Sequence, residues 1–172
     1  MINKPAILAL ADGTVLEGFS IGASGESVGE LVFNTAMTGY QEMLTDPSYA
    51  RQIVMINTAH VGNTGCNLDD MESSRAWAAG LVVRDCSLIP SNYRSTKSLP
   101  DWLKKQGVVA IAGIDTRELT LRLRDQGAIG ACISTNVTDT AHAVTLAREF
   151  KGLAGVDLAK LVSRKTVERW HE

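Results

Sequence analysis

The sequence has no excess of positive charge and no long apolar run. Its 172 residues contain 17 Lys and Arg against 19 Asp and Glu, which leaves a formal net charge of -2. A protein that binds nucleic acid or a membrane surface would show a basic excess in at least one segment, so we expect neither as a partner. The longest nearly unbroken apolar stretch, residues 108–114, is far shorter than the roughly 20 residues that cross a bilayer.

Cysteines and targeting signals are also scarce. Cys66, Cys86 and Cys132 are odd in number and far apart in the chain, so they do not indicate a disulfide framework. The apolar run near the amino end is short and is followed at once by Asp12, unlike the apolar region and cleavage site of a secretory signal. We therefore expect a protein of the reducing cytoplasm.

The composition that is present is that of an ordinary globular domain, with 45% hydrophobic and 21% charged residues. In the first third, residues 6–11 and 15–21 flank Asp12-Gly13, a pattern that predicts a β-hairpin. Residues 28–33, 53–56 and 77–83 predict further strands. Residues 57–75 form a long polar loop, and such loops are uncommon in compact domains unless they have a function.

The second half alternates helix and strand. Helices are predicted over residues 99–106, from the N-cap Asp115 to Gln126, and from a cap at Thr138 or Thr140 to about residue 150. Strands are predicted over residues 108–114 and 129–134. This alternation favours parallel pairing with right-handed crossovers. The fold class is therefore mixed α/β, with an antiparallel front half and a parallel α/β back half.

Few side chains are arranged for catalysis. Cys66 and His60 share the long loop and could form the thiolate pair of a stand-alone hydrolase, but nothing near them orients the histidine or forms a nucleophile elbow. Together with Asp69-Asp70 they lack the spacing of a zinc site, so we predict no metal. The glycine-containing turns at residues 22–25 and 62–65 do not open a helix and do not end in Gly-Lys-Ser/Thr, which argues against a phosphate site.

The segment Asp46-Pro47-Ser48-Tyr49 has the signature of a type I turn, with Asp in the first position and Pro in the second. Such a turn places the hydroxyl of Ser48 at a corner. From the residues alone, a hydroxyl that stabilises the turn is the favoured interpretation, and ligand binding is the alternative.

The sequence resembles the N-terminal part of the small subunit of glutamine-dependent carbamoyl-phosphate synthetase over essentially its whole length. The resemblance is carried by a long run and several shorter motifs, which are residues 33–42 (FNTAMTGYQE), 44–49 (LTDPSY), 52–54, 60–63, 80–85 (GLVVRD) and 114–117 with 119–120 and 123–124. The resemblance implies a swivelling β/β/α three-layer fold. It also implies that residues 1–152 form the N-terminal domain and that residues 153–172 begin a linker to an absent glutaminase domain.

The same resemblance implies a function. Ser48 matches a family residue that contacts the glutamine substrate, and this chain carries no catalytic residue, because the Cys–His–Glu set belongs to the absent half. We place Met37, Gly39, Tyr40 and Asp46 at the border of the glutamine cleft and of an ammonia passage, with Gly39 allowing close backbone approach and Tyr40 forming a wall. The implied partners are the large synthetase subunit, the glutaminase domain and glutamine. ATP and Mg are expected on the large subunit, and no cofactor is expected in this chain. A domain that serves assembly alone is the remaining alternative.

Overall fold

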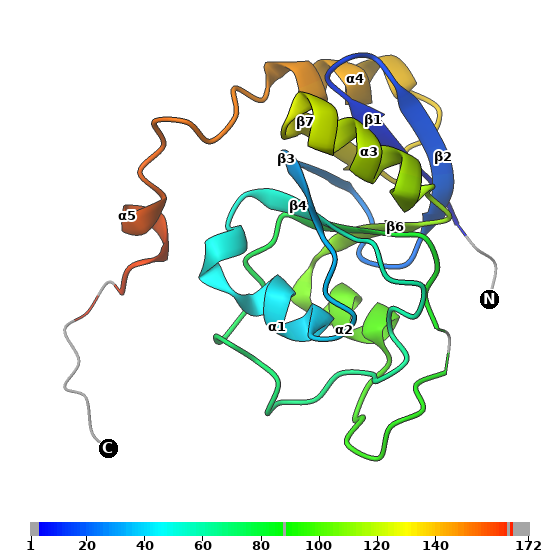
Figure 1. Ribbon diagram of the computed structural model, residues 1–172, viewed down its shortest axis with the longest axis vertical. Helices are drawn as coiled ribbons and strands as arrows, with labels where there is room; N and C mark the ends of the chain where they lie inside the picture. Colours follow the sequence, from blue (N-terminus) through cyan, green and yellow to red (C-terminus); the bar gives the residue numbers. More distant parts are fainter. Residues whose placement is uncertain (1–3, 88, 165, 167–172) are drawn as a thin grey trace.

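The computed structural model describes residues 4–87, 89–164 and 166. Seven strands close into a barrel in the order β1-β2-β6-β5-β4-β3-β7 (Figure 1). The strands are β1 (Pro5–Leu10), β2 (Val15–Ser20), β3 (Glu26–Asn34), β4 (Gln52–Ile56), β5 (Gly80–Val83), β6 (Val109–Ala112) and β7 (Ile129–Ser134). The helices are α1 (Tyr40–Thr45), the 3₁₀ helix η1 (Pro47–Tyr49), α2 (Leu99–Gln106), α3 (Thr116–Gln126), α4 (Thr140–Glu149) and α5 (Leu158–Val162).

The barrel mixes parallel and antiparallel pairs, which confirms the mixed α/β class. The predicted hairpin of β1 and β2 forms, with Leu8 opposite Leu16. Strands β3, β4, β5 and β6 are parallel neighbours. The remaining pairs, β1 with β7, β2 with β6 and β3 with β7, are antiparallel.

The predicted division into an antiparallel front half and a parallel back half is wrong in its detail. Strand β3 lies in the front half, yet it pairs in parallel with β4. Strand β7 lies in the back half, yet it pairs antiparallel with β1 and β3, and β6 pairs with β2 and β5 instead of β7. Alternation of helix and strand fixes neither the neighbour nor the direction of a strand when the sheet closes on itself. The three-layer swivelling description stays a prediction.

The central strands are buried on both faces, which explains their continuous apolar runs. On β4, Ile53 and Met55 belong to one hydrophobic cluster, which also takes in Leu119 and Leu123 of α3. Val54 and Ile56 belong to a second cluster, built with α1 and α2. Burying both faces of the same strand explains why β4 to β6 contain almost no polar residue.

The predicted N-cap residue of α3 is confirmed, whereas that of α4 is not. The Asp115 side chain accepts hydrogen bonds from the backbone N–H groups of Arg117 and Glu118, as predicted. The cap of α4 was expected at Thr138 or Thr140, but the side chain of Asp139 takes this role, accepting from the N–H of His142 at 2.9 Å. All three residues are ordinary N-cap types, so the sequence could not choose among them.

Helix α4 packs on β7 and β1, with Ala143 and Ala147 fully buried. The contact is close because Gly130 has no side chain: a Cβ there would lie 2.5 Å from the carbonyl oxygen of Ala147. After α4 the chain runs away from the barrel, and α5, predicted within residues 157–162, buries none of its residues (Figure 1). Residues 165 and 167–172 of the predicted linker lie outside the described residues, and the domain boundary at 152 stays a prediction.

Candidate functional site

A short helix that the sequence analysis did not predict leads into the predicted site. Helix α1 begins after Gly39, whose φ of 86° lies in the left-handed region, where glycine is strongly favoured. An added Cβ at Gly39 would meet only the Glu42 carboxyl group, at 3.9 Å. The conformation by itself favours glycine here, and the close backbone approach that we expected at the cleft stays a prediction.

The corner at Ser48 forms as predicted, within the 3₁₀ helix η1. The carboxylate of Asp46 accepts a hydrogen bond from the backbone N–H of Ser48 at 2.8 Å, and the N–H of Tyr49 donates to the carbonyl oxygen of Asp46 at 3.1 Å. The second bond is the i to i+3 bond of a type I turn. Asp46 therefore holds the corner, while the Ser48 side chain is exposed.

The hydroxyl of Ser48 has no hydrogen-bonding partner within the described part of the chain, because the bond that stabilises the turn uses its backbone N–H. The turn-stabilising role that we favoured from the residues alone belongs to the carboxylate of Asp46. The Ser48 hydroxyl is thus positioned by a fixed backbone and is available to donate to, or accept from, a group outside the domain.

Met37 lies in the loop before α1 and is 82% exposed. This loop, residues 35–39, begins where the N–H of Ala36 donates to Asn34 Oδ1 at 2.7 Å. Asn34 also reaches the Ser48 corner, since its side-chain amide donates to the Tyr49 hydroxyl at 2.9 Å. Asn34 and Tyr49, which the sequence analysis did not single out, therefore connect the loop to the corner. No local sequence pattern predicts this contact, because it joins residues of two different elements.

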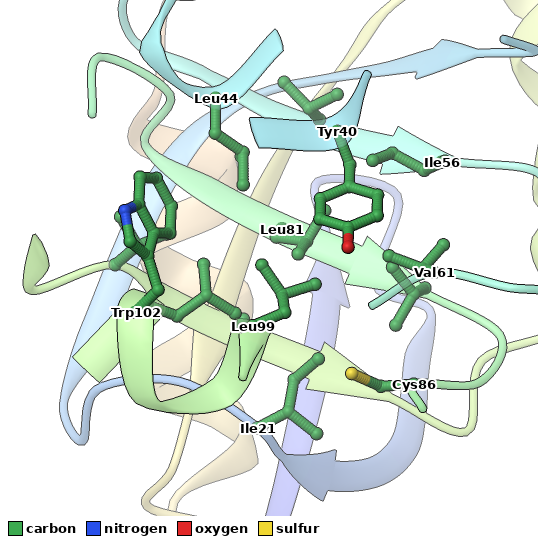
Figure 2. Close-up of a cluster of buried hydrophobic side chains, with 14 of the residues drawn as sticks. Ile21, Tyr40, Leu44, Ile56, Val61, Leu81, Cys86, Leu99 and Trp102 are labelled. Carbon is green, nitrogen blue, oxygen red and sulfur yellow. The ribbon is translucent and has the colours of Figure 1, made fainter. Parts of the chain in front are cut away.

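Among the predicted residues of the cleft border, Tyr40 is unusual because it is only 4% exposed. Figure 2 shows its ring among the apolar side chains of the α1–α2 cluster, close to Leu81 and Val61. Its hydroxyl donates to the carbonyl oxygen of Gly65 at 2.8 Å and accepts from Thr64 Oγ1 at 2.7 Å. Burial raises the pKa of Tyr40 to about 12. The structure gives Tyr40 a role in fixing the long loop, and its place beside a passage stays a prediction.

Gln41, next in α1, is the second buried residue that holds the long loop, and the sequence analysis missed it. It is 2% exposed, and its side-chain amide makes two hydrogen bonds to the backbone of Asn67. The Nε2 group donates to the Asn67 carbonyl oxygen at 2.6 Å, and Oε1 accepts from the Asn67 N–H at 3.0 Å. Gln41 of α1 therefore holds the backbone of the long loop at Asn67.

The structure disfavours a hydrolase built on Cys66 and His60. Cys66 is 1% exposed, and burial raises the pKa of its thiol to about 12, with the negative charges of Cys86, Asp70 and Glu42 adding to the effect. Such a thiol is almost entirely protonated at neutral pH and is a poor nucleophile. His60 lies on the surface.

Within residues 4–87, 89–164 and 166, no three His, Cys, Asp or Glu side chains are grouped so that they could hold a metal ion. Over the same ranges, every helix is too short or too polar to cross a bilayer.

The family model and the curated relatives that match this chain carry the same description. Residues 8–133 match the family model described as carbamoyl-phosphate synthase small chain, CPSase domain. The chain is 59% identical over 171 residues to the carbamoyl phosphate synthase small chain of Pseudomonas putida, covering 98% of this chain and 45% of that protein. It is 56% identical to the small chain of Xanthomonas campestris pv. campestris, covering 99% of this chain and 46% of the relative.

Among solved structures, an aminopeptidase from Aneurinibacillus sp. strain AM-1 aligns with 78% of this chain and 31% of its own, at 17% identity and a TM-score of 0.43. That likeness is too slight to bear on the fold. The chain spans less than half the length of the curated relatives that it matches, and corresponds to their N-terminal part. From the family match and the extent of sequence identity, the chain belongs to the family of the carbamoyl-phosphate synthase small chain and comprises its CPSase domain.

Proposed function

We propose that this chain is the non-catalytic N-terminal domain of the small subunit of glutamine-hydrolysing carbamoyl-phosphate synthetase. The complete enzyme would use glutamine, bicarbonate and ATP to form carbamoyl phosphate for arginine and pyrimidine biosynthesis in the cytoplasm. In this proposal the glutaminase half that follows the domain supplies the catalytic thiolate. The synthetase subunit holds ATP and Mg, and the domain itself contributes to the glutamine cleft.

The observation that carries the proposal is the state of Ser48. Its backbone is fixed by Asp46, its side chain is exposed, and its hydroxyl is without a partner among the described residues. A free amino acid presents an ammonium group and a carboxylate, and a positioned hydroxyl can hydrogen-bond to either group. The corner can therefore complete a glutamine cleft whose remaining walls come from the glutaminase half.

The exposed loop at residues 35–39, with Met37 at its centre, lies on the same part of the domain because Asn34 links the loop to Tyr49. An exposed loop with a large apolar side chain at its centre can help to exclude bulk water from a substrate cleft when a second domain closes over it. Exclusion of water matters for this reaction, because free ammonia in water at neutral pH is mostly protonated and loses its nucleophilic lone pair. We assign Met37 and Asp46 to the border of this passage.

The experiment uses the complete enzyme with Ser48→Phe and, as a matched control, Ser24→Phe, which alters another exposed serine. We expect Ser48→Phe to raise the KM for glutamine by about tenfold or more, which corresponds to about 1.4 kcal/mol of lost binding. Synthesis driven by added ammonia should be unchanged, and Ser24→Phe should alter neither reaction. An unchanged KM for glutamine would instead support a domain that serves assembly alone, and equal loss of both reactions would indicate misfolding and contradict the proposal.

A further inference from the structure

Two irregular segments lie side by side along one end of the barrel, below it in Figure 1, and we name their described residues, 57–75, 84–87 and 89–98, the paired loops. They are joined along their length. The N–H of Ser87 donates to the carbonyl oxygen of Val61, that of Ser91 to Asn63, and that of Cys66 to Lys97, at 2.7 to 2.9 Å. This hydrogen bonding makes the paired loops one ordered surface.

The paired loops carry apolar side chains that the domain itself does not cover. Leu68 is 85% exposed and Tyr93 is 96% exposed, and both lie next to residues that are firmly held. Leu68 follows Asn67, whose backbone is held by Gln41, and Tyr93 precedes Arg94, which pairs with Asp70 at 2.7 Å. A large apolar side chain on an ordered backbone is already arranged for contact, and binding it costs less ordering entropy than a flexible loop would.

Beside Leu68 the paired loops and α2 enclose a groove of about 500 Å³. Its apolar walls include Leu68, Met71 and Trp102, and its polar walls include Lys97, Lys105 and Gln106. None of the described residues that line the groove is Asp or Glu. Neither lysine takes part in an ion pair within the described ranges. The groove thus combines apolar side chains with a rim of two exposed lysines, on a chain whose net charge is negative.

We infer that this groove binds a segment of the large synthetase subunit that offers an apolar side chain flanked by carboxylates. The inference rests on the proposed function, which gives the domain two neighbours. The glutaminase half is placed at the Ser48 corner, and the groove, whose lining includes none of the corner residues 46–49, is assigned to the second neighbour. Apolar anchors in a pocket, surrounded by complementary charges, are the usual arrangement of residues that dominate an interface.

The test measures the affinity between the purified large subunit and the complete small subunit that contains this domain. Leu68→Glu places a negative charge at the apolar anchor, and Lys105→Glu reverses one rim charge. We expect each substitution to raise the Kd by about tenfold or more. Lys105→Glu should also reduce the dependence of the Kd on salt concentration.

Two matched controls carry the same changes elsewhere. Leu121→Glu alters an exposed leucine on α3, and Lys151→Glu alters an exposed lysine after α4, and neither should change the Kd. Thermal unfolding of each small subunit verifies its fold. All four sites are exposed, so folding defects are not expected.

The outcomes separate this inference from the proposed function. If the unaltered subunits do not associate at all, the proposed function fails. If they associate and Leu68→Glu binds as tightly as Leu121→Glu, the inference is wrong while the proposed function stands. If Leu68→Glu keeps its affinity for the large subunit but loses glutaminase activity, the groove is occupied by the remainder of the small subunit, and the inference is again overturned.

Discussion

The side-chain amide of Asn34 donates a hydrogen bond of 2.9 Å to the hydroxyl of Tyr49. This bond joins the end of β3 to the residue that follows Ser48. Asn34 also accepts from the N–H of Ala36 through its side chain, and from the N–H of Asn57 through its backbone carbonyl group. One residue therefore connects the loop before α1, the corner at Ser48 and the end of β4.

Removing the Tyr49 hydroxyl should loosen this corner. Tyr49→Phe deletes a partly buried hydrogen bond, so we expect the free energy of unfolding to fall by about 1 kcal/mol. In the complete enzyme, the KM for glutamine should rise while the ammonia-dependent rate is unchanged, because the altered residue acts by positioning Ser48. Urea unfolding and steady-state kinetics measure the two effects. Ser24→Ala, which deletes the hydroxyl of an exposed serine, is the control and should change neither quantity.

Gln41 should be more important for stability than its position in a six-residue helix suggests. Gln41→Ala leaves both the N–H and the carbonyl oxygen of Asn67 without their partner in a buried site, and we expect a loss of about 2 kcal/mol or more in the free energy of unfolding. Urea denaturation of the domain is the measurement. The same change at the exposed Gln126 should have almost no effect, and equal stability of the two variants would contradict the role given to Gln41.

The contact between β7 and α4 leaves no room for a methyl group. In Gly130→Ala the new Cβ would lie 2.5 Å from the Ala147 carbonyl oxygen, so the helix must shift away from the sheet. We expect the domain to lose about 1–3 kcal/mol of stability, the usual cost of overpacking. Gly107→Ala is a useful comparison, because a Cβ at Gly107 meets no atom within 4 Å and only its φ of 72° opposes the change. A Gly130→Ala variant as stable as the parent protein would show that α4 moves without cost.

The three thiols should make the stability of the domain fall in alkaline solution. Burial raises the pKa of Cys66 to about 12 and those of Cys86 and Cys132 to about 11, whereas the pKa of a thiol in the unfolded chain is about 8.5. Above that pH the unfolded chain releases protons that the folded chain keeps, so the free energy of unfolding decreases as pH rises. Urea midpoints measured from about pH 8 to about pH 10 should show this decrease. Cys66→Ala should weaken it, and a midpoint that is constant over this interval would contradict the assigned burial.

The sequence predicts those parts of the molecule that local chemistry decides. Asp12-Gly13 specifies the hairpin turn, Gly107 ends α2, and Asp115 caps α3, and the structure confirms all three. Local chemistry does not decide the order of the strands. The antiparallel pairing of Cys132 with Val28 and with Ala9, for example, joins residues that are far apart in the chain. Alternation of helix and strand predicted a parallel partner for β7. In the closed barrel, β7 instead lies antiparallel between β1 and β3.

In the candidate site, too, the sequence predicts local features but not contacts between distant residues. The turn around Ser48 could be read from Asp46 and Pro47, since each residue acts on its immediate neighbours. Helix α1 was missed because its six residues are too few to show a period, and its glycine start resembles a loop. The clamp of Gln41 on Asn67 and the bond from Asn34 to Tyr49 connect separate elements. No spacing in the sequence could indicate either contact.

Every strand of the barrel has a hydrogen-bonded neighbour on both sides. Among the described residues, no strand therefore has a wholly free edge of backbone N–H and C=O groups to which another polypeptide could add a strand along its full length. We therefore expect recognition by a neighbouring chain to depend mainly on side chains at the surface. Contacts of that kind can be altered one residue at a time, so affinity for a partner can be tuned by substitution at the surface while the backbone framework remains the same.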